Sequence, residues 1–109
     1  MIAFNQPYRL FEIGQLVRHQ RYGYRGVIAR YDLSCQASDE WYLSNNTQPN
    51  RTQPWYHVLV DSPDKDAITY AAQSSLMADS EQTPIQHPLV DNLFEDFVDG
   101  RYIPRADKS

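Results

Sequence analysis

The stretch from Ile13 to Asp32, IGQLVRHQRYGYRGVIARYD, constrains the fold of this chain more than any other. Leu16–His19 is a short run of apolar and basic residues, and Arg25–Tyr31 is rich in residues that favour strands. Arg21–Tyr24, between them, contains a glycine at the point of reversal. The stretch therefore predicts a β-hairpin, around which the rest of a small β-fold can assemble.

The two glycines of this hairpin have different expected roles. Gly23 lies in the turn, where a residue without a Cβ adopts a positive φ at little cost. Gly26 lies at the start of the second strand, where glycine marks either a bulge or a close approach of another backbone. A bulge there would curl the strand, and curling is how a small sheet closes into a barrel.

Length and composition indicate one small domain of 109 residues. We expect a flexible N-terminal arm over residues 1–10, a folded domain over 11–104 and a flexible tail over 105–109. The chain has no run of about 18 apolar residues and no secretory pattern at its N-terminus, so we expect no membrane segment and a cytoplasmic location. The single cysteine, Cys35, cannot form an intramolecular disulfide, and we interpret it as a structural residue.

The net charge of −4 conceals an uneven distribution. Residues 1–36 contain five arginines and two carboxylates, whereas residues 37–109 contain five basic and twelve acidic side chains. The positive charge is therefore concentrated near the hairpin. Such a patch can bind phosphate, but the acidic remainder repels a polyanion at long range. Any binding of nucleic acid should have a small footprint and a strong dependence on salt.

The middle of the chain predicts a short helix and a second hairpin. Ser38 is placed to cap a helix that runs out at Asn45, and the polar loop that follows extends to Pro54. Trp55–Asp61 is the most apolar run and predicts a central strand, with Ala67–Ala71 as its partner. The role of the inserted segment 38–54 stays open.

The C-terminal part predicts an amphipathic helix that ends at Gly100. Pro88 suits a first helical turn, and apolar residues recur at three- and four-residue spacings after it. We expect a short extension, Arg101–Ile103, to follow. The chain thus predicts a mainly β fold: a small SH3-like β-barrel with a short inserted helix and a C-terminal amphipathic helix. The members of the apolar stripe are Leu89, Val90, Leu93, Phe94 and Phe97.

Four separated motifs carry a resemblance to a known family. They are IGQLVRHQRYGYRGVIARYD, QPWYHVLVD, ITYAAQSSL and IQHPLVDNLFEDFVDGRY, and together they span about residues 11–104. In order and spacing they are similar to the YccV-like hemimethylated-DNA-binding domain family, of the heat-shock protein Q type. The resemblance implies an SH3-like barrel in a cytoplasmic, stress-response protein. Ala71–Gln73 departs from the acidic step that many relatives have at that point.

The resemblance implies two different functions on one scaffold. One is that of a regulator that enhances the specificity of the Lon protease, and this is the function we expect. The alternative is binding of hemimethylated DNA near the replication origin through the arginine-rich hairpin. The candidate DNA-binding residues are Arg18, His19, Arg21, Tyr22, Tyr24 and Arg25. The same arginines can instead pair with the protein's own acidic residues, and the sequence does not choose.

A protein partner would use aromatic side chains, which are enriched at interfaces. The candidates are Trp41 and Trp55 near the insertion and Phe94 and Phe97 in the tail, and a second copy of the chain could also cover the tail helix.

No enzyme motif is present. His19, His57 and His87 are dispersed, without the spacing of metal ligands. We therefore expect a non-enzymatic protein with no metal and no cofactor.

Overall fold

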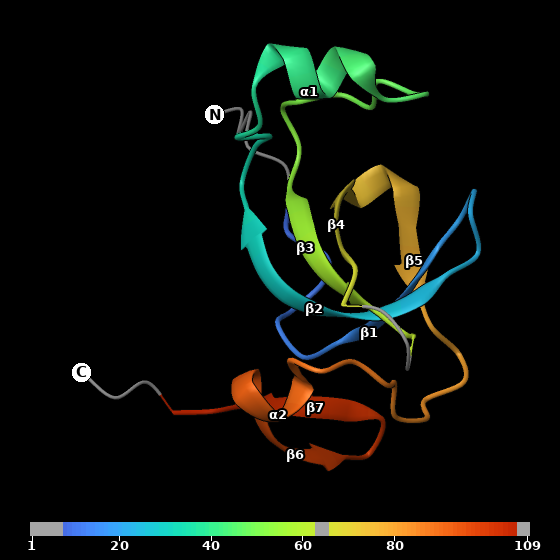
Figure 1. Ribbon diagram of the computed structural model, residues 1–109, viewed down its shortest axis with the longest axis vertical. Coiled ribbons are helices and arrows are strands. Elements are labelled where there is room, and N and C mark those ends of the chain that lie inside the picture. Colours follow the sequence, from blue (N-terminus) through green and yellow to red (C-terminus); the bar gives the residue numbers. More distant parts are fainter. Residues whose placement is uncertain (1–7, 63–65, 107–109) are drawn as a thin grey trace, which may run out of the picture.

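A computed structural model describes residues 8–62 and 66–106, which form a mainly β structure (Figure 1). The main sheet has five antiparallel strands in the order β4-β3-β2-β1-β5. The strands are β1 (Leu16–His19), β2 (Arg25–Asp32), β3 (Trp55–Val60), β4 (Ile68–Ala72) and β5 (Leu76–Ala78), and a single 3-10 turn, η1 (Gln73–Ser75), joins β4 to β5. A separate pair, β6 (Phe94–Val98) and β7 (Arg101–Pro104), lies beneath the sheet.

The predicted hairpin is confirmed as β1 and β2, which pair with Leu16 opposite Val27. Gly23 has a φ of 79°, as a turn glycine should. Gly26 is the close-approach case, because a Cβ there would overlap the carbonyl of Leu59 on β3 and the side chain of Val58. The bulge, which was the other alternative for Gly26, occurs further along, between Ile28 and Arg30 in the pairing of β2 with β3.

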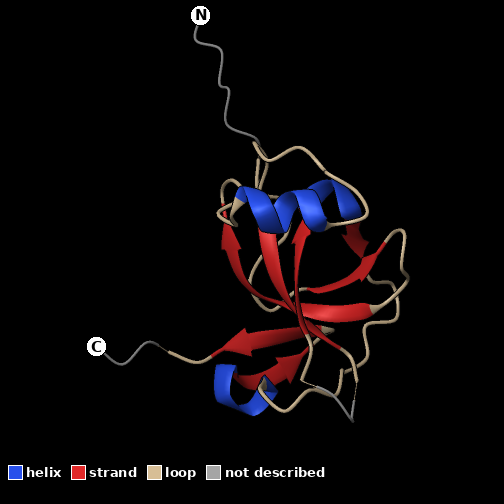
Figure 2. Cartoon of the chain, turned by 45° about the horizontal axis from the view of Figure 1, so that its top comes forward, coloured by secondary structure: helices blue, strands red, loops and turns tan. Residues whose placement is uncertain are grey.

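The inserted helix is confirmed as α1 (Asp39–Ser44). The hydroxyl of Ser38 accepts a hydrogen bond from the backbone N–H of Trp41, which caps the first turn. Arg51 anchors the returning loop, since its guanidinium donates to the carbonyl of Ala37 and lies 3.4 Å from a carboxylate oxygen of Asp39. Figure 2 shows α1 lying across the ends of the sheet strands.

The predicted C-terminal helix is wrong over most of its length. Only α2 (Val90–Leu93) is helical, and the residues that follow form the hairpin β6–β7. Asp99 and Gly100 have φ values of 54° and 80°, so both central residues of the connection are left-handed. Two such residues between paired strands make a type I′ turn, for which Asp-Gly is a preferred sequence. That dipeptide outweighs the apolar spacing that we interpreted as helical.

The core divides between the faces of the curved sheet. Val17, Ile28, Tyr56 and Val58 fill one side together with Phe11. On the other side the C-terminal hairpin covers the sheet, with Leu16, Val27, Leu59, Ile85, Phe94 and Tyr102 buried together. The backbone N–H of Tyr102 donates to the carbonyl of Gly14, which ties this hairpin to the start of β1.

The main sheet is open, because its edge strands β4 and β5 do not pair with each other in the part of the chain that is described. The mainly β class is thus established, whereas closure into a barrel is not. No helix of the described residues is long and apolar enough to cross a membrane. Of the flexible arm and tail that we expected, residues 1–7 and 107–109 lie outside the described residues. Within the arm, Gln73 holds the backbone of Tyr8 and Leu10 by hydrogen bonds.

Candidate functional site

Two of the three candidate DNA-binding arginines are paired with carboxylates of the protein itself. Arg25 lies 2.9 Å from one carboxylate oxygen of Asp79, and Arg18 lies 3.2 Å from the other. The Asp79 side chain is completely buried. Glu81 contacts both arginines and Asp61 contacts Arg25, so two cations face three carboxylates and the cluster has a net charge of −1. Self-pairing, one of the two interpretations left open by the sequence, therefore holds for Arg18 and Arg25.

Arg21 differs from its neighbours. At the exposed tip of the hairpin, it has no carboxylate within ion-pairing distance among residues 8–62 and 66–106, and its guanidinium lies 5.9 Å from the ring centre of Tyr22. Beside it is a shallow hollow, which we call the tip surface, between the hairpin, η1 and the loop after α1. Apart from Arg21, its lining carries amide, hydroxyl and imidazole groups and no carboxylate: His19, Gln20, Thr47, Gln48, Pro49, Ser74 and Ser75.

His19 organises the hairpin tip. Its Nδ1 accepts hydrogen bonds from the backbone N–H groups of Arg21 and Tyr22, both at 3.1 Å. An Nδ1 that accepts places the ring proton on Nε2. The imidazole also packs against Tyr22 and Tyr24, with ring centres 4.6 and 5.1 Å away. Burial, followed by the charge of Arg21, lowers the pKa of His19, so a neutral ring offers one Nε2–H donor.

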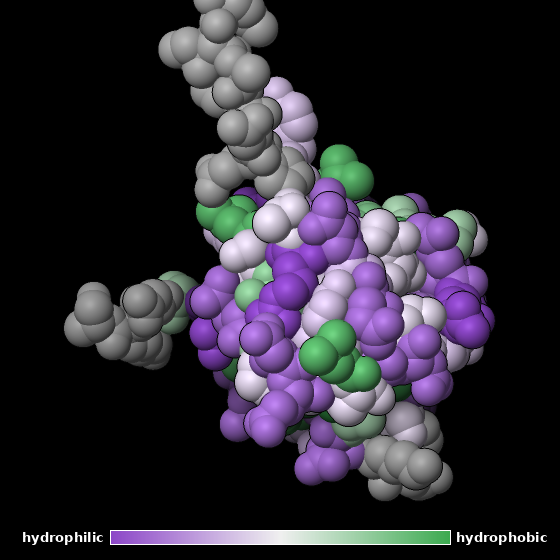
Figure 3. All heavy atoms as spheres, turned by 90° about the horizontal axis from the view of Figure 1, so that it is seen from above, coloured by the Kyte–Doolittle hydropathy of each residue, from purple (hydrophilic) through white to green (hydrophobic). Residues whose placement is uncertain are grey.

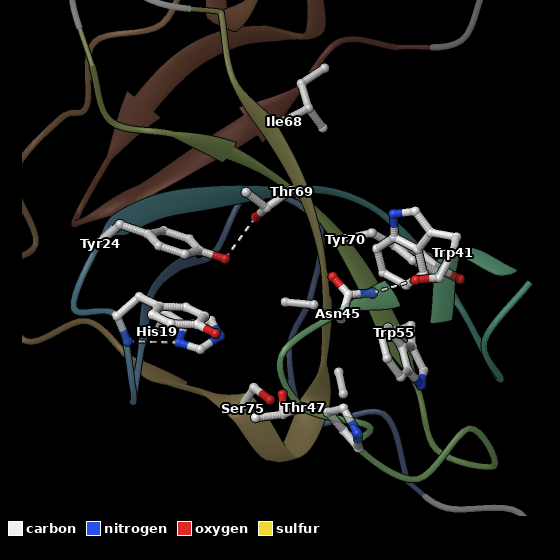
Figure 4. A pocket seen from close by; sticks show the side chains of 14 residues that line it. His19, Tyr24, Trp41, Asn45, Thr47, Trp55, Ile68, Thr69, Tyr70 and Ser75 are labelled. Carbon is white, nitrogen blue, oxygen red and sulfur yellow. Dashed lines mark hydrogen bonds between the residues drawn. The ribbon is translucent and has the colours of Figure 1, made fainter. Parts of the chain in front are cut away.

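A second groove adjoins the tip surface. We call it the aromatic groove; its volume is about 340 Å³. In Figure 4, His19 and Tyr24 lie on one side of strand β4, and Trp41, Trp55 and Tyr70 lie on the other. The hydroxyls of Tyr24 and Thr69 share a hydrogen bond of 2.7 Å. The remaining lining residues are Tyr22, Asn45, Thr47, Pro49, Ile68, Ala71, Ala72 and Ser75, so the groove contains no carboxylate.

Tyr70 is the best-anchored aromatic residue of the groove. Its hydroxyl donates to a carboxylate oxygen of Asp32 at 2.6 Å and accepts from the backbone N–H of Gln36. Burial, together with the bond to the carboxylate, raises the pKa of Tyr70 well above its ordinary value. Trp41 packs edge-on against it, at 5.7 Å between ring centres. This wall therefore carries no charge of its own, and the nearby Asp32 carboxylate accepts the hydrogen bond of Tyr70.

The four predicted partner residues do not form one surface. Trp41 and Trp55 both line the aromatic groove, but Trp41 is 36% exposed and Trp55 is almost fully buried. Phe94 is buried in the core and Phe97 is partly buried against the same cluster, away from the groove. A partner role for these two phenylalanines stays a prediction, and for Phe94 it would require the hairpin to move.

Sequence reasoning missed several residues that matter here. The sequence gives no sign that Asp79 is buried, and it places Thr69 and Tyr70 only in the strand that pairs with Trp55–Asp61. The segment Ala67–Ala71 predicts a strand, but no local signal shows that this strand borders a groove. In the described residues, no three His, Cys, Asp or Glu side chains lie close enough together to hold a metal ion.

Comparison with known proteins identifies relatives over most of the chain. A family model described as hemimethylated DNA-binding protein YccV like matches residues 9–101. Among curated proteins, F-box only protein 21 from Homo sapiens, Pongo abelii and Mus musculus are each 36% identical over 100 residues, which is 89% of this chain. The chain spans only about one-sixth of their length, since the match covers 15% or 16% of each.

Proposed function

The chain belongs to the YccV-like family of hemimethylated DNA-binding proteins, and on that premise we propose that it is a non-enzymatic module that binds DNA through the tip surface. The observation that carries this proposal is the guanidinium of Arg21, which has no carboxylate within ion-pairing distance among the described residues and lies beside a hollow lined without carboxylates. The SH3-like closure of the curved sheet belongs to the same proposal, as does a cytoplasmic, stress-response setting.

The side chains of the tip surface suit contacts to the DNA backbone. Arginine, glutamine, threonine and serine are the types that most often bond phosphate oxygens. Because Arg18 and Arg25 are occupied by Asp79, we expect one or two phosphates to be neutralised instead of three or more. Each neutralised phosphate contributes about −0.9 to the slope of log affinity against log salt concentration. The slope should therefore lie between about −1 and −2.

The test is fluorescence anisotropy of labelled duplexes in hemimethylated, fully methylated and unmethylated forms across a salt series. We expect Arg21→Glu to reduce binding by about tenfold or more and to flatten the slope by about one, since it removes a phosphate contact. Arg30→Glu is a matched control, because Arg30 is an exposed arginine of β2 that lies outside the tip surface. Equal losses in the two variants would indicate only a general charge effect and would refute a site at the tip.

A second candidate is the role of a specificity-enhancing partner of the Lon protease, the function that we expected from the sequence. The observation in its favour is the aromatic groove, which is better suited to a polypeptide than to a phosphate backbone. Degradation of a Lon substrate with and without the purified protein tests it. A rate that is unchanged at all concentrations of the protein would exclude this role.

A further inference from the structure

The strand β4 has one edge without a strand partner among the described residues. It pairs with β3 only. Just before β4, the carbonyl of Ala67 accepts a hydrogen bond from the backbone N–H of Val60, and just after it the N–H of Gln73 donates to the carbonyl of Pro54. Because hydrogen-bonded pairs alternate along antiparallel strands, Thr69 and Ala71 also point towards β3. The backbone groups of Ile68 and Tyr70 therefore point the other way, towards the free edge, whereas Ala72 at the end of the strand is only 1% exposed.

The aromatic groove runs along this edge. All five residues of β4 line it, and aromatic side chains stand on both faces of the strand (Figure 4). His19 and Tyr24 lie on the face of Thr69, and Trp41 lies on the face of Tyr70. An added strand would send successive side chains to opposite faces, so that each would meet one of these walls. A groove of this form suits an extended peptide, which gains main-chain bonds from the edge and specificity from the walls.

The chemistry of the groove indicates what the peptide should carry. The lining has no carboxylate, although the whole chain has a net charge of −4, and Arg21 stands at the neighbouring hairpin tip. The Nε2–H of His19 and the indole N–H of Trp41 have no hydrogen-bond partners among the described residues, and both side chains line the groove. These features favour a peptide with apolar or aromatic side chains in the groove and an acidic residue at the end nearest Arg21. The surface seen from the α1 side is mostly hydrophilic, with only isolated hydrophobic residues (Figure 3), so no broad apolar patch competes with the groove there.

We propose that the aromatic groove binds an extended peptide of a partner protein, with apolar and acidic residues, which adds as a strand to the free edge of β4. At about 3.3 Å per residue, five residues would cover the length of β4. Arg21, which makes the proposed DNA contact, does not line the groove, although the two surfaces share His19, Thr47, Pro49 and Ser75.

The test begins with a library of capped hexapeptides that have apolar or aromatic residues at alternate positions and either acidic or basic flanks. We expect the acidic-flanked members to bind and the basic-flanked members to bind at least about tenfold more weakly. The best peptide is then N-methylated at one backbone nitrogen at a time. Strand addition predicts that alternate N-methyl groups reduce affinity by about tenfold, the equivalent of one hydrogen bond, while the others leave it nearly unchanged.

Two readouts on the protein complete the experiment. In amide hydrogen exchange, the bound peptide should protect Ile68 and Tyr70 and leave the rates of Thr69 and Ala71 unchanged. Ile68→Pro removes one outward N–H at a half-exposed edge position, where proline is tolerated, and Ile68→Ala is the control that keeps it. We expect about a tenfold loss of peptide affinity for the proline variant and less than threefold for alanine. DNA binding should be the same in both.

Three results would overturn the proposal. The first is a library without any member that binds below about 1 mM. The second is peptide affinity that does not depend on which backbone nitrogen is methylated, or that is the same for Ile68→Pro as for the unchanged protein. The third is competition by a hemimethylated duplex that protects the same β4 amides, which would assign the groove to nucleobases. These three results concern the groove along β4, so they can be interpreted even if Arg21→Glu leaves DNA binding unchanged.

Discussion

The buried carboxylate of Asp79 should contribute more to stability than any other charged group of the hairpin region. Its two oxygens bond Arg18 and Arg25, and its side chain has no exposed area. Asp79→Asn keeps the shape but removes the charge, and it turns an amide N–H towards one of the two guanidinium groups. Each bond to a charged group is worth about 1.5–3 kcal/mol, and a buried charge that loses its partner adds a desolvation cost.

The loss is only partly compensated. Arg25 keeps Asp61, Glu81 and the carbonyl of Thr83, and Arg18 is 37% exposed, so solvent screens it. We therefore expect the free energy of unfolding to fall by about 3 kcal/mol. For a domain of this size that corresponds to a decrease in Tm of roughly 12 °C.

Urea denaturation followed by tryptophan fluorescence measures this change, with an unchanged slope against urea as the sign that the folded state is preserved. Glu81→Gln is the matched control: it neutralises a carboxylate that contacts the same two arginines but is 48% exposed, and should cost less than about 1 kcal/mol. If Asp79→Asn costs no more than Glu81→Gln, burial of the carboxylate is not what stabilises this cluster.

Three further predictions concern the elements around the site. Gly26→Ala should lower the free energy of unfolding by about 2–3 kcal/mol, because the added Cβ would overlap β3. Gly23→Ala should lower it by only about 1 kcal/mol, the cost of a positive φ at alanine. Equal effects of the two variants in urea denaturation would contradict the close approach of β3 to Gly26. Ser38→Ala should cost about 1 kcal/mol and speed exchange of the Trp41 amide, with an unchanged exchange rate as the contrary result. Because the folded pKa of His19 is depressed, the unfolded chain binds more protons below about pH 6.5, and stability should fall as the pH decreases from there through the folded pKa. An NMR titration of His19 in its ordinary range would refute this.

Local signals were sufficient for the elements that lie near one another in the chain. The glycine turn and the β-forming run of Arg25–Tyr31 predicted β1 and β2, and the apolar run after Pro54 predicted β3. The cap at Ser38 predicted α1 for the same reason, since each signal lies within a few residues of what it determines.

The C-terminal error has a local cause. The apolar residues from Leu89 to Phe97 fit a helical spacing, but only the first turn, α2, is helical. The Asp99-Gly100 dipeptide was the stronger signal, because a type I′ turn requires positive φ at two successive residues. Greater weight on this turn would have predicted β6 and β7.

The binding surfaces depend on contacts that no local pattern contains. Asp79 is more than fifty residues from the arginines it binds, and the aromatic groove combines the β1–β2 hairpin with α1, β3 and β4. The sequence showed an excess of arginine in the hairpin, but only the fold determines which of the three candidate arginines pair with carboxylates among the described residues. Arg21 was among the candidates, and it was not distinguishable from Arg18 or Arg25.

The pairing of β6 with β7 also determines where a shortened version of this domain can end. The family match stops at residue 101, but the ladder continues until Pro104 lies opposite Phe94, and Tyr102 carries the backbone bond to Gly14. A polypeptide cut at residue 101 would lose Tyr102 from the core and leave Phe94 without its neighbour. When this unit is excised from a longer relative, we expect soluble expression only if the cut falls after the residue equivalent to Pro104.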